Sequence, residues 1–451
     1  MSFFTRVKRS IRRDPPHASA TRARSTASNL LLHIHPPRVS VASLRFTYTF
    51  GLGGLAVLLL AVLVITGGLL LFVYVPSPEG AYRSIVALQT EVAYGQLIRN
   101  LHHWSGNLLL VVAFLHMLRV FYTAAFRTPR EFNWLLGLAL LGLAAFANFT
   151  GYLLPWDQLA YWAATVANSL IEHIPLLGGA ISRLLLGGEE IGVATLRNFY
   201  ALHVVVIPLS MLAVGLFHIW RVRKDRFTLP RRIGESLLAR PRTVPTLPHL
   251  VSRELVFALV ALALLLTWAT WADAPLEGAA DPNKPPNPTK AAWYFVGVQE
   301  LLFHFHPTFG AFVIPALVLG ALVVLPYLRD DADVTGIWFR SWRGRGLALL
   351  SLLLGVSTTA GMVWLSETRL YLPEALPFLP TVISNGLLPL GIILLALYGY
   401  ARLLRRLGAD PGEVRLALFT LLLAAFLTLT VIGVVFRGED MRLLIPWEGA
   451  P

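Results

Sequence analysis

The sequence contains no cysteine, although it is 451 residues long. Disulfide bonds, zinc sites built from cysteine, iron–sulfur clusters and thioether-attached haem are therefore excluded within this chain. Any metal ion that the chain binds must be held by histidine, methionine or carboxylate ligands, or must belong to a partner.

Charged residues are also scarce, at 14% of the chain, and 56% of the residues are hydrophobic. A soluble domain usually has about 25% charged residues. The net charge of +13 would suit a nucleic-acid partner, but the basic residues lie between apolar runs, where orientation in a lipid membrane explains them better. We therefore expect an all-α, polytopic transmembrane helical bundle that binds no nucleic acid.

Nine apolar runs are long enough to cross about 30 Å of hydrocarbon as helices. They are 50–75, 96–122, 131–155, 199–221, 254–273, 309–328, 345–366, 381–402 and 414–436. Basic clusters precede the first run and follow every second run after it. This alternation predicts a cytoplasmic N-terminus and a C-terminus on the opposite, positive side of the membrane.

The segments between the runs suggest where domains begin and end. We expect a basic cytoplasmic arm at 1–45, with no apolar core of a secretory signal, a four-helix domain at 46–222, a linker at 223–253, a second domain at 254–330 and further transmembrane helices at 331–451. Two other segments are long. Segment 156–198 is expected to contain short amphipathic helices, and the proline-dense segment 274–308 to form a rigid loop without regular structure.

Four histidines lie at matched positions in the second and fourth runs. His102 and His116 are fourteen residues apart, which returns an α-helix to within about 40° of the same face. His203 and His218 are fifteen apart, which gives about 60°. Each spacing covers about 21 Å along the helix. Because the two runs cross in the same direction, we expect two opposed imidazole pairs, one near each membrane face, while His103 points elsewhere.

A lone histidine in a bundle is most often a packing or hydrogen-bonded residue, but four at matched spacing indicate function, because ionisable groups are costly inside a bilayer. Opposed imidazole pairs suit bis-histidine haem. Zinc would need further ligands, and none lies nearby on these helix faces. We therefore predict that His102, His116, His203 and His218 are metal ligands for two non-covalent b-type haems.

The glycines of the first and third runs repeat the fourteen-residue spacing: Gly53 with Gly67, Gly54 with Gly68, and Gly137 with Gly151. Small residues are common where membrane helices pack. Glycine also lets a backbone lie close to a porphyrin edge, because it has no Cβ. The shared period favours haem contact at Gly53, Gly67, Gly137 and Gly151.

At this point the sequence resembles a known family, the dihaem cytochrome b of quinol-oxidising cytochrome bc-type complexes, in the bacterial form with fused N- and C-terminal halves. The resemblance covers most of residues 45–330. It rests on "RNLHHWSGN" with "FLHMLRVF", on "TGYLLPWDQLAYWA", on "TLRNFYALH" with "GLFHIWRVRK", and on "AAWYFVGVQELL". It implies a dihaem-binding domain at 46–222 and a quinol-site loop within 254–330.

The resemblance also implies residue roles. His102 and His203 would hold the positive-side haem, and His116 and His218 the negative-side haem. Arg99 and Arg119 match positions that neutralise haem propionates, a task that suits the guanidinium group.

Three departures from the family pattern affect these expectations. The quinol-site motif Pro-Glu-Trp-Tyr reads Ala291, Ala292, Trp293, Tyr294 here, so the usual acid is absent. Glu300 would take quinol protons instead or be a charge at the start of a helix, with His304 and His306 as nearby alternatives. Asn198 replaces a family arginine, for which Arg197 would compensate. Finally, three spans follow the sixth, and without cysteine an extra haem would be absent or held non-covalently.

The mechanism that the resemblance implies is electron bifurcation in the plasma membrane of a bacterium. Quinol is oxidised on the positive side, at Trp293 and Tyr294. One electron leaves to a separate Rieske iron–sulfur protein and onward to a c-type cytochrome or similar acceptor. The other crosses both haems and reduces quinone near Arg223, Lys224 and Asp225, and protons are translocated. The implied assembly is a homodimer within a multi-subunit complex.

Two other functions stay open at this stage. A dihaem membrane anchor of a dehydrogenase or hydrogenase would carry electrons without bifurcation, although the "WYF" and "PWDQ" segments argue against it. A transporter with intramembrane histidines would usually show inverted repeats, and no convincing repeat is visible in the sequence.

Overall fold

The computed structural model describes residues 3–11, 36, 38–235, 242–330, 333–368 and 372–444. In these residues, nine helical segments are long and apolar enough to cross a membrane: Leu52–Leu70, Gly95–Tyr122, Glu131–Leu153, Val193–Asp225, His249–Trp271, Thr308–Tyr327, Trp342–Thr368, Ile383–Arg406 and Pro411–Val435. Each overlaps one predicted run, which confirms the expected all-α bundle. Much of the predicted arm (1–2, 12–35 and 37), 236–241 of the linker, and 331–332, 369–371 and 445–451 lie outside the described residues.

The chain divides into two compact units, each discontinuous in sequence. Unit 1 comprises Met1–Leu154, Phe199–Leu276 and Val323–Arg340, and unit 2 comprises Pro155–Asn198, Glu277–Leu322 and Ser341–Pro451. The chain leaves the first unit and returns to it twice.

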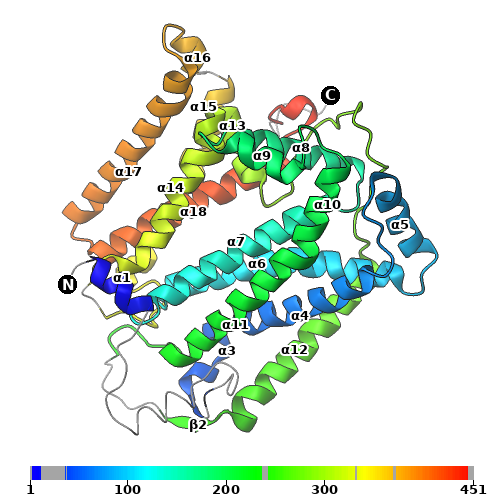
Figure 1. Ribbon diagram of the computed structural model, residues 1–451. Helices are drawn as coiled ribbons and strands as arrows, with labels where there is room; N and C mark the ends of the chain where they lie inside the picture. Colours follow the sequence, from blue (N-terminus) through cyan, green and yellow to red (C-terminus); the bar gives the residue numbers. More distant parts are fainter. Residues whose placement is uncertain are drawn as a thin grey trace. The chain divides into compact units, whose positions relative to one another are not determined.

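Unit 1 is built around four long helices. Its elements are α1 (Phe3–Ile11), β1 (Arg38–Ser40), η1 (Ala42–Leu44), α3 (Phe46–Thr49), α4 (Leu52–Leu70), α5 (Pro78–Thr90), α6 (Gly95–Tyr122), α7 (Glu131–Leu153), η2 (Leu202–Val206), α11 (Ile207–Asp225), β2 (Thr243–Pro245), α12 (Thr246–Trp271) and η4 (Leu325–Tyr327). Helix α4 packs on α6, α6 on α7, and α7 on α11, so these four form one bundle (Figure 1). Helix α12 covers α6 and α4.

Several elements of unit 1 were not predicted, among them α5 and the strands β1 and β2. Helix α5 begins where Ser77 accepts a hydrogen bond from the Gly80 amide, with Pro78 at the first turn, a standard start signal. Strands β1 and β2 pair antiparallel, with Val39 opposite Val244. The pairing joins the end of the N-terminal arm to the segment that was expected to be only a linker.

Unit 2 contains α8 (Gln158–Glu172), α9 (Gly178–Leu186), α13 (Val296–His304), η3 (Thr308–Val313), α15 (Trp342–Thr368), α16 (Leu372–Ala375), η5 (Ile383–Leu387), α17 (Leu388–Arg406), α18 (Pro411–Val435) and η6 (Glu439–Met441). Helices α10 (Val193–Ala201) and α14 (Ile314–Val324) run across the unit boundaries. Helix α18 is central, because α13, α15 and α17 all pack against it. Asp410 and Glu413 form a capping box at its start.

The loop predictions are partly right. Helices α8 and α9 confirm the expected short helices in 156–198. The segment 274–308 is not wholly irregular, because its last part forms helix α13. The prolines responsible for that prediction all precede Lys290, and the sequence from Val296 onward contains strong helix formers up to His304.

In the part of the chain that the structure describes, three membrane-length helices contain one π-helical turn, and each such turn is followed by a proline. The turns are η2, η3 and η5, and the prolines are Pro208, Pro315 and Pro389, each the second residue of the next α-helix. Proline has no amide hydrogen and its ring crowds the carbonyl four residues earlier. A wider turn with one extra residue relieves that conflict.

Candidate functional site

Two of the four predicted ligands face each other in unit 1. His102 lies on α6 and His203 on η2, and their ring centroids are 6.1 Å apart with an angle of 74° between the planes. A metal ion bound between two imidazole nitrogens, at about 2.0 Å from each, requires centroids about 6 Å apart. The spacing therefore fits one ion between the two rings.

Hydrogen bonds fix the orientation of both rings. Nδ1 of His203 donates to the Ala147 carbonyl at 3.0 Å and lies 3.2 Å from the Thr150 hydroxyl. Nδ1 of His102 lies 2.9 Å from the Thr66 hydroxyl, which itself donates to the Val62 carbonyl. Because a carbonyl only accepts, Nδ1 of His203 carries the proton and its Nε2 keeps a lone pair. A hydrogen bond on the ring nitrogen that faces away from the metal is typical of metal-bound histidine.

The second pair consists of His116 on α6 and His218 on α11, and both residues also lie in unit 1. Its surroundings differ from those of the first pair. Nδ1 of His218 is buried and interacts with the Asn133 backbone without a hydrogen bond of standard geometry. His103 lies outside both pairs, where Asn107 bonds to it and its ring contacts Trp104.

Each predicted glycine lies against one predicted histidine. A Cβ added to Gly151 would lie 2.5 Å from the His203 ring, and one on Gly67 would lie 3.2 Å from the His102 ring. The corresponding distance is 3.5 Å for Gly53 toward His116 and for Gly137 toward His218. Gly54 and Gly68 share the spacing but would meet nothing within 4 Å. The immediate neighbour of each glycine is thus an imidazole, which the missing Cβ allows to pack on the helix.

The donor set suits haem better than a bare ion. Among the described residues, no group of three or more His, Asp or Glu side chains is placed to hold a metal. Two imidazoles without further protein ligands leave the remaining positions of an iron ion to a porphyrin. The residues present therefore fit a bis-histidine haem at His102 and His203.

The two arginines assigned to propionates make bonds within the protein. Arg99 is buried, and its guanidinium donates to the carbonyls of Ala274 and Pro275 at 2.7 and 2.6 Å. Arg119 donates through Nε to the Tyr48 carbonyl at 3.0 Å, and its guanidinium stacks 4.2 Å above the Tyr48 ring. Arg99 thereby fastens the chain after α12 to the start of α6.

Arg223 lies in the last turn of α11 and is partly exposed. Its neighbours are more constrained than the sequence suggests. Asp225 is buried and pairs with Arg221 at 3.0 Å, and Lys224 lies 4.6 Å above the Trp220 ring. Of the three residues expected near a quinone, Arg223 and Lys224 remain accessible and Asp225 does not.

Unit 2 brings together the two loop segments assigned to the quinol site. Asp157 pairs with Ala279 in an antiparallel bridge, and the Gln158 amide donates to the Gly278 carbonyl at 2.8 Å. Asp157 also accepts from the Glu277 amide at 3.1 Å. Burial, and then the negative charge of Asp157, raise the pKa of Glu277. The "PWDQ" segment and the loop after α12 thus form one paired structure.

The Trp293–Tyr294 pair precedes α13 and is held by a residue that the sequence analysis missed. Trp293 is 41% exposed and packs edge-on against Tyr294, with centroids 5.5 Å apart. Gln299 is buried and its amide spans the turn before them, donating to the Thr289 carbonyl at 2.9 Å and accepting from the Ala291 amide at 2.8 Å. Gln299 therefore fixes the backbone that presents both aromatic rings.

Glu300 lies in a buried ion-pair cluster. It is 1% exposed, and Arg437 donates to it through Nε at 3.1 Å and through a second nitrogen at 2.5 Å. Burial would raise the pKa of Glu300, but hydrogen bonds from His304 and Arg437 outweigh it and lower the pKa. Glu300 is therefore an anion at neutral pH. His306 takes no part in the hydrogen bonds described for this cluster, and its buried Nδ1 has no partner among the described residues.

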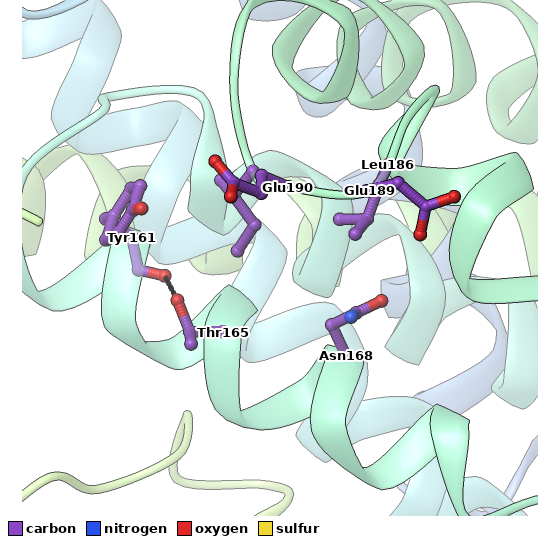
Figure 2. Close-up of a pocket in the computed structure, with 7 residues that line it drawn as sticks. Tyr161, Thr165, Asn168, Leu186, Glu189 and Glu190 are labelled. Carbon is purple, nitrogen blue, oxygen red and sulfur yellow. Dashed lines mark hydrogen bonds between the residues drawn. The ribbon is translucent and has the colours of Figure 1, made fainter. Parts of the chain in front are cut away.

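One open pocket, of about 260 Å³, lies between α8 and the end of α9 in unit 2 (Figure 2). It is lined by Tyr161, Thr165, Asn168, Leu186, Glu189, Glu190 and Ile191. Burial, and then Glu190, raise the pKa of Tyr161. The pocket contains no histidine and none of the predicted site residues.

The two threonines beside the first imidazole pair, Thr66 and Thr150, were missed, although the sequence contains a signal for them. Thr66 and Thr150 each stand directly before a glycine of the fourteen-residue pattern, Gly67 and Gly151. The same pattern, a threonine directly before a glycine that faces a histidine, therefore occurs in both α4 and α7. Arg437 had no such signal, because it is 137 residues away from Glu300.

Together, the fold and the paired imidazoles define a class: multi-pass helical membrane proteins that hold haem inside a four-helix bundle. Residues 39–226 match the family described as cytochrome b/b6/petB. Cytochrome b6 of Heliobacterium mobile is 42% identical over 179 residues, which cover 40% of this chain and 84% of that relative. The chain therefore belongs to the cytochrome b/b6 family, and its membership implies b-type haem.

Two further similarities extend this result. The cytochrome b subunit of the menaquinol:cytochrome c reductase of Geobacillus thermodenitrificans is 38% identical over 199 residues, covering 44% of this chain and 89% of that relative. A solved hyperthermophilic respiratory complex III has a TM-score of 0.63 at 23% identity and covers 92% of this chain and 97% of its own. The structural likeness, which shows the fold, thus extends well beyond the residues that the curated relatives match.

Proposed function

We propose that the chain is the cytochrome b subunit of a quinol:cytochrome c-type oxidoreductase that holds two b-type haems. His102 with His203 and His116 with His218 are the ligand pairs. The observation that carries the proposal is the 6.1 Å spacing of the first pair, with hydrogen bonds on Nδ1 of both rings. The relative from Geobacillus thermodenitrificans supports a quinol reductant and makes menaquinol the first substrate to test.

When bound, haem would supply one-electron carriers near both membrane faces. The chain itself supplies the ligands, the fixed tautomer of His203 and close helix packing at the four glycines. Without cysteine the chain has no means of holding an iron–sulfur cluster. The electron that does not enter the haems is therefore accepted by a separate Rieske protein. A c-type cytochrome or similar subunit then receives that electron.

Quinol oxidation is assigned to the loops of unit 2. Exposed Trp293, supported by Tyr294 and fixed through Gln299, offers an aromatic surface for the quinol ring. Ala292 provides no acid at the usual motif position, so the quinol protons must be taken up by another group.

The membrane arrangement follows from the basic clusters. We place the N-terminus and Arg223 on the cytoplasmic side of a bacterial plasma membrane, where quinone is reduced and protons are taken up. Quinol oxidation then lies on the positive side, and turnover translocates protons. A homodimer within a multi-subunit complex, with 46–222 as the dihaem domain, completes the proposal.

A redox-titrated optical spectrum of the purified complex tests this function. We expect two b-haem components in the native protein and loss of one of them in His102→Ala. Added oxidant should cause transient haem reduction in the presence of quinol, and an inhibitor of the positive-side quinol site should abolish it. A dihaem anchor would show both components without that reduction, and a spectrum without haem bands would refute the proposal.

A further inference from the structure

Helix α17 of unit 2, orange in Figure 1, has two opposite faces. One face packs inward: Leu404 is 2% exposed and joins a buried cluster with residues of α18, and the Tyr400 hydroxyl lies 2.9 Å from the Ser351 hydroxyl of α15. On the other face, Leu395 is 70% exposed and Tyr398 is 62% exposed. This second face is therefore open to the surroundings of the protein.

The open face changes from apolar to basic along its length. Counted from Leu395, the positions of Tyr398, Arg402, Arg405 and Arg406 all lie within about 80° of it on an α-helix. The three arginines are exposed and lie in the last two turns of α17. A strip of open apolar side chains thus leads directly to three guanidinium groups.

Two glycines leave space beside the apolar part of this strip. Gly391 and Gly399 lie within about 40° of Leu395 on the helix, and a Cβ on either would meet nothing within 4 Å. Because α17 belongs to a segment long and apolar enough to cross a membrane, the surroundings of the strip are lipid chains. A long apolar chain can therefore lie against the backbone here.

The basic end of α17 lies at the level of the lipid headgroups. Arg343, at the start of α15, donates to the Gly408 carbonyl at 2.9 Å, just beyond the end of α17, and the adjacent Trp342 is 70% exposed. Exposed tryptophan and tyrosine are enriched where a membrane meets water. Trp342 and Tyr398 therefore mark the height at which the three arginines leave the hydrocarbon.

The positive charge of these three arginines is not balanced among the described residues. Their side chains form no hydrogen bond or ion pair with any other residue that the structure describes. The next acids along the chain are engaged, since Asp410 and Glu413 form the capping box of α18. Cations one helical turn apart repel each other, and the end of a helix offers only about half a negative charge. A bound anion would supply the missing charge.

We propose that this face of α17 is a binding site for one anionic phospholipid. Its phosphate is held by Arg402 and Arg406, one turn apart on the same side of the helix, with Arg405 at the edge. Guanidinium groups suit this task, because they bind phosphate oxygens through two parallel hydrogen bonds. The acyl chains lie along Leu395 and Tyr398. The site does not depend on the proposed function.

The test compares two triple variants of the intact complex. The first removes the charges of the site: Arg402→Gln, Arg405→Gln and Arg406→Gln. The control removes the same charge from three other exposed arginines: Arg232→Gln, Arg242→Gln and Arg329→Gln. Native mass spectrometry measures the binding of phosphatidylglycerol and of phosphatidylcholine with the same acyl chains.

We expect the native complex to prefer phosphatidylglycerol, and the first variant to bind it at least about tenfold more weakly, because each basic residue near an anionic lipid adds to its affinity. The control should bind phosphatidylglycerol as the native complex does. Equal affinity of the native complex for the two phospholipids would overturn the proposal. An equal loss in both variants would also overturn it, because the arginines would then act only through the net charge of the chain.

A second pair of variants tests the apolar part of the site without changing any charge. Gly399→Leu fills the open strip, and Gly361→Leu on α15 is the control, because a Cβ at either glycine meets nothing within 4 Å. We expect only Gly399→Leu to weaken the binding of phosphatidylglycerol. Glycerol phosphate, which has no acyl chains, should bind the native complex far more weakly. Unchanged binding in Gly399→Leu, or glycerol phosphate bound as tightly as the lipid, would overturn the proposal.

Discussion

At the scale of single residues, the missing Cβ atom of four glycines determines how closely their helices approach a histidine ring. Gly53, Gly67, Gly137 and Gly151 each face an imidazole across a helix contact. The tightest approach is at Gly151, where the added Cβ would overlap the His203 ring. The ring has little room to move, because its Nδ1 is bonded to the Ala147 carbonyl.

We predict that Gly151→Ala displaces the His203 ring and that about half of the bound haem is lost, because overpacking at a fixed contact forces side chains to shift. Haem per chain, measured by the absorbance of its pyridine complex, checks this expectation. Gly142→Ala on the same helix is the control, because a Cβ there meets nothing within 4 Å and should leave haem content unchanged. Equal haem in both variants would contradict the assignment.

At the scale of helices, the π-helical turn η2 explains how two unequal spacings produce similar faces. His102 and His116 are fourteen residues apart on an uninterrupted α-helix. His203 and His218 are fifteen apart, and the π-helical turn between them absorbs one residue. Fifteen residues with one π-turn therefore advance the helix by nearly the same angle as fourteen residues in α geometry.

Deleting Val205 from η2 should remove the extra residue and leave His203 and His218 on one face, so we expect both haems to be retained. Deleting Leu108 from α6, where there is no π-turn, should rotate His102 by about 100° relative to His116 and lose haem. Both deleted side chains are exposed, at 50% and 37%, so neither deletion opens a cavity in the core. Optical redox titration compares the two variants. If the Val205 deletion lost as much haem as the Leu108 deletion, the role given to the π-turn would be wrong.

At the scale of the whole molecule, all four predicted ligands lie within the first half of the chain, but unit 1 also takes in later segments. Arg99 bonds to the Ala274 and Pro275 carbonyls, and the Asn100 side chain donates to the Ala269 carbonyl at 2.9 Å. The second half of the chain therefore supports the four-helix bundle without contributing any of the predicted ligands.

We predict that a fragment of residues 1–235 binds haem, because it contains every predicted ligand and glycine, but unfolds at a lower temperature than the intact chain. Each lost hydrogen bond to residues 269–275 is worth about 1 kcal/mol. Co-expression with residues 242–451 should restore the unfolding midpoint. Arg99→Met in the intact chain is the matched control and should reproduce part of the loss. A fragment without haem would show that the second half is required for ligation.

Several features could be predicted from the sequence because they depend on local periodicity. The apolar runs gave nine spans, the histidine spacing gave two shared faces, and the family motifs pointed to cytochrome b. Helix α13 was missed because the prolines before it dominated the composition of the segment. Strands β1 and β2 were missed because their pairing joins residues about 200 positions apart in the chain.

The sequence by itself determined the membrane class, the number of spans and which histidines share a helix face, since side chains repeat at fixed angles along a helix whatever surrounds it. Only the tertiary structure decided which helix faces meet. It placed Gly53, but not Gly54, against a histidine ring. It also brought the Thr66 hydroxyl to hydrogen-bond distance of His102 and paired Arg437 with Glu300. These outcomes depend on how far apart two helices lie and how they are rotated, and neither quantity is encoded in the spacing along one of them.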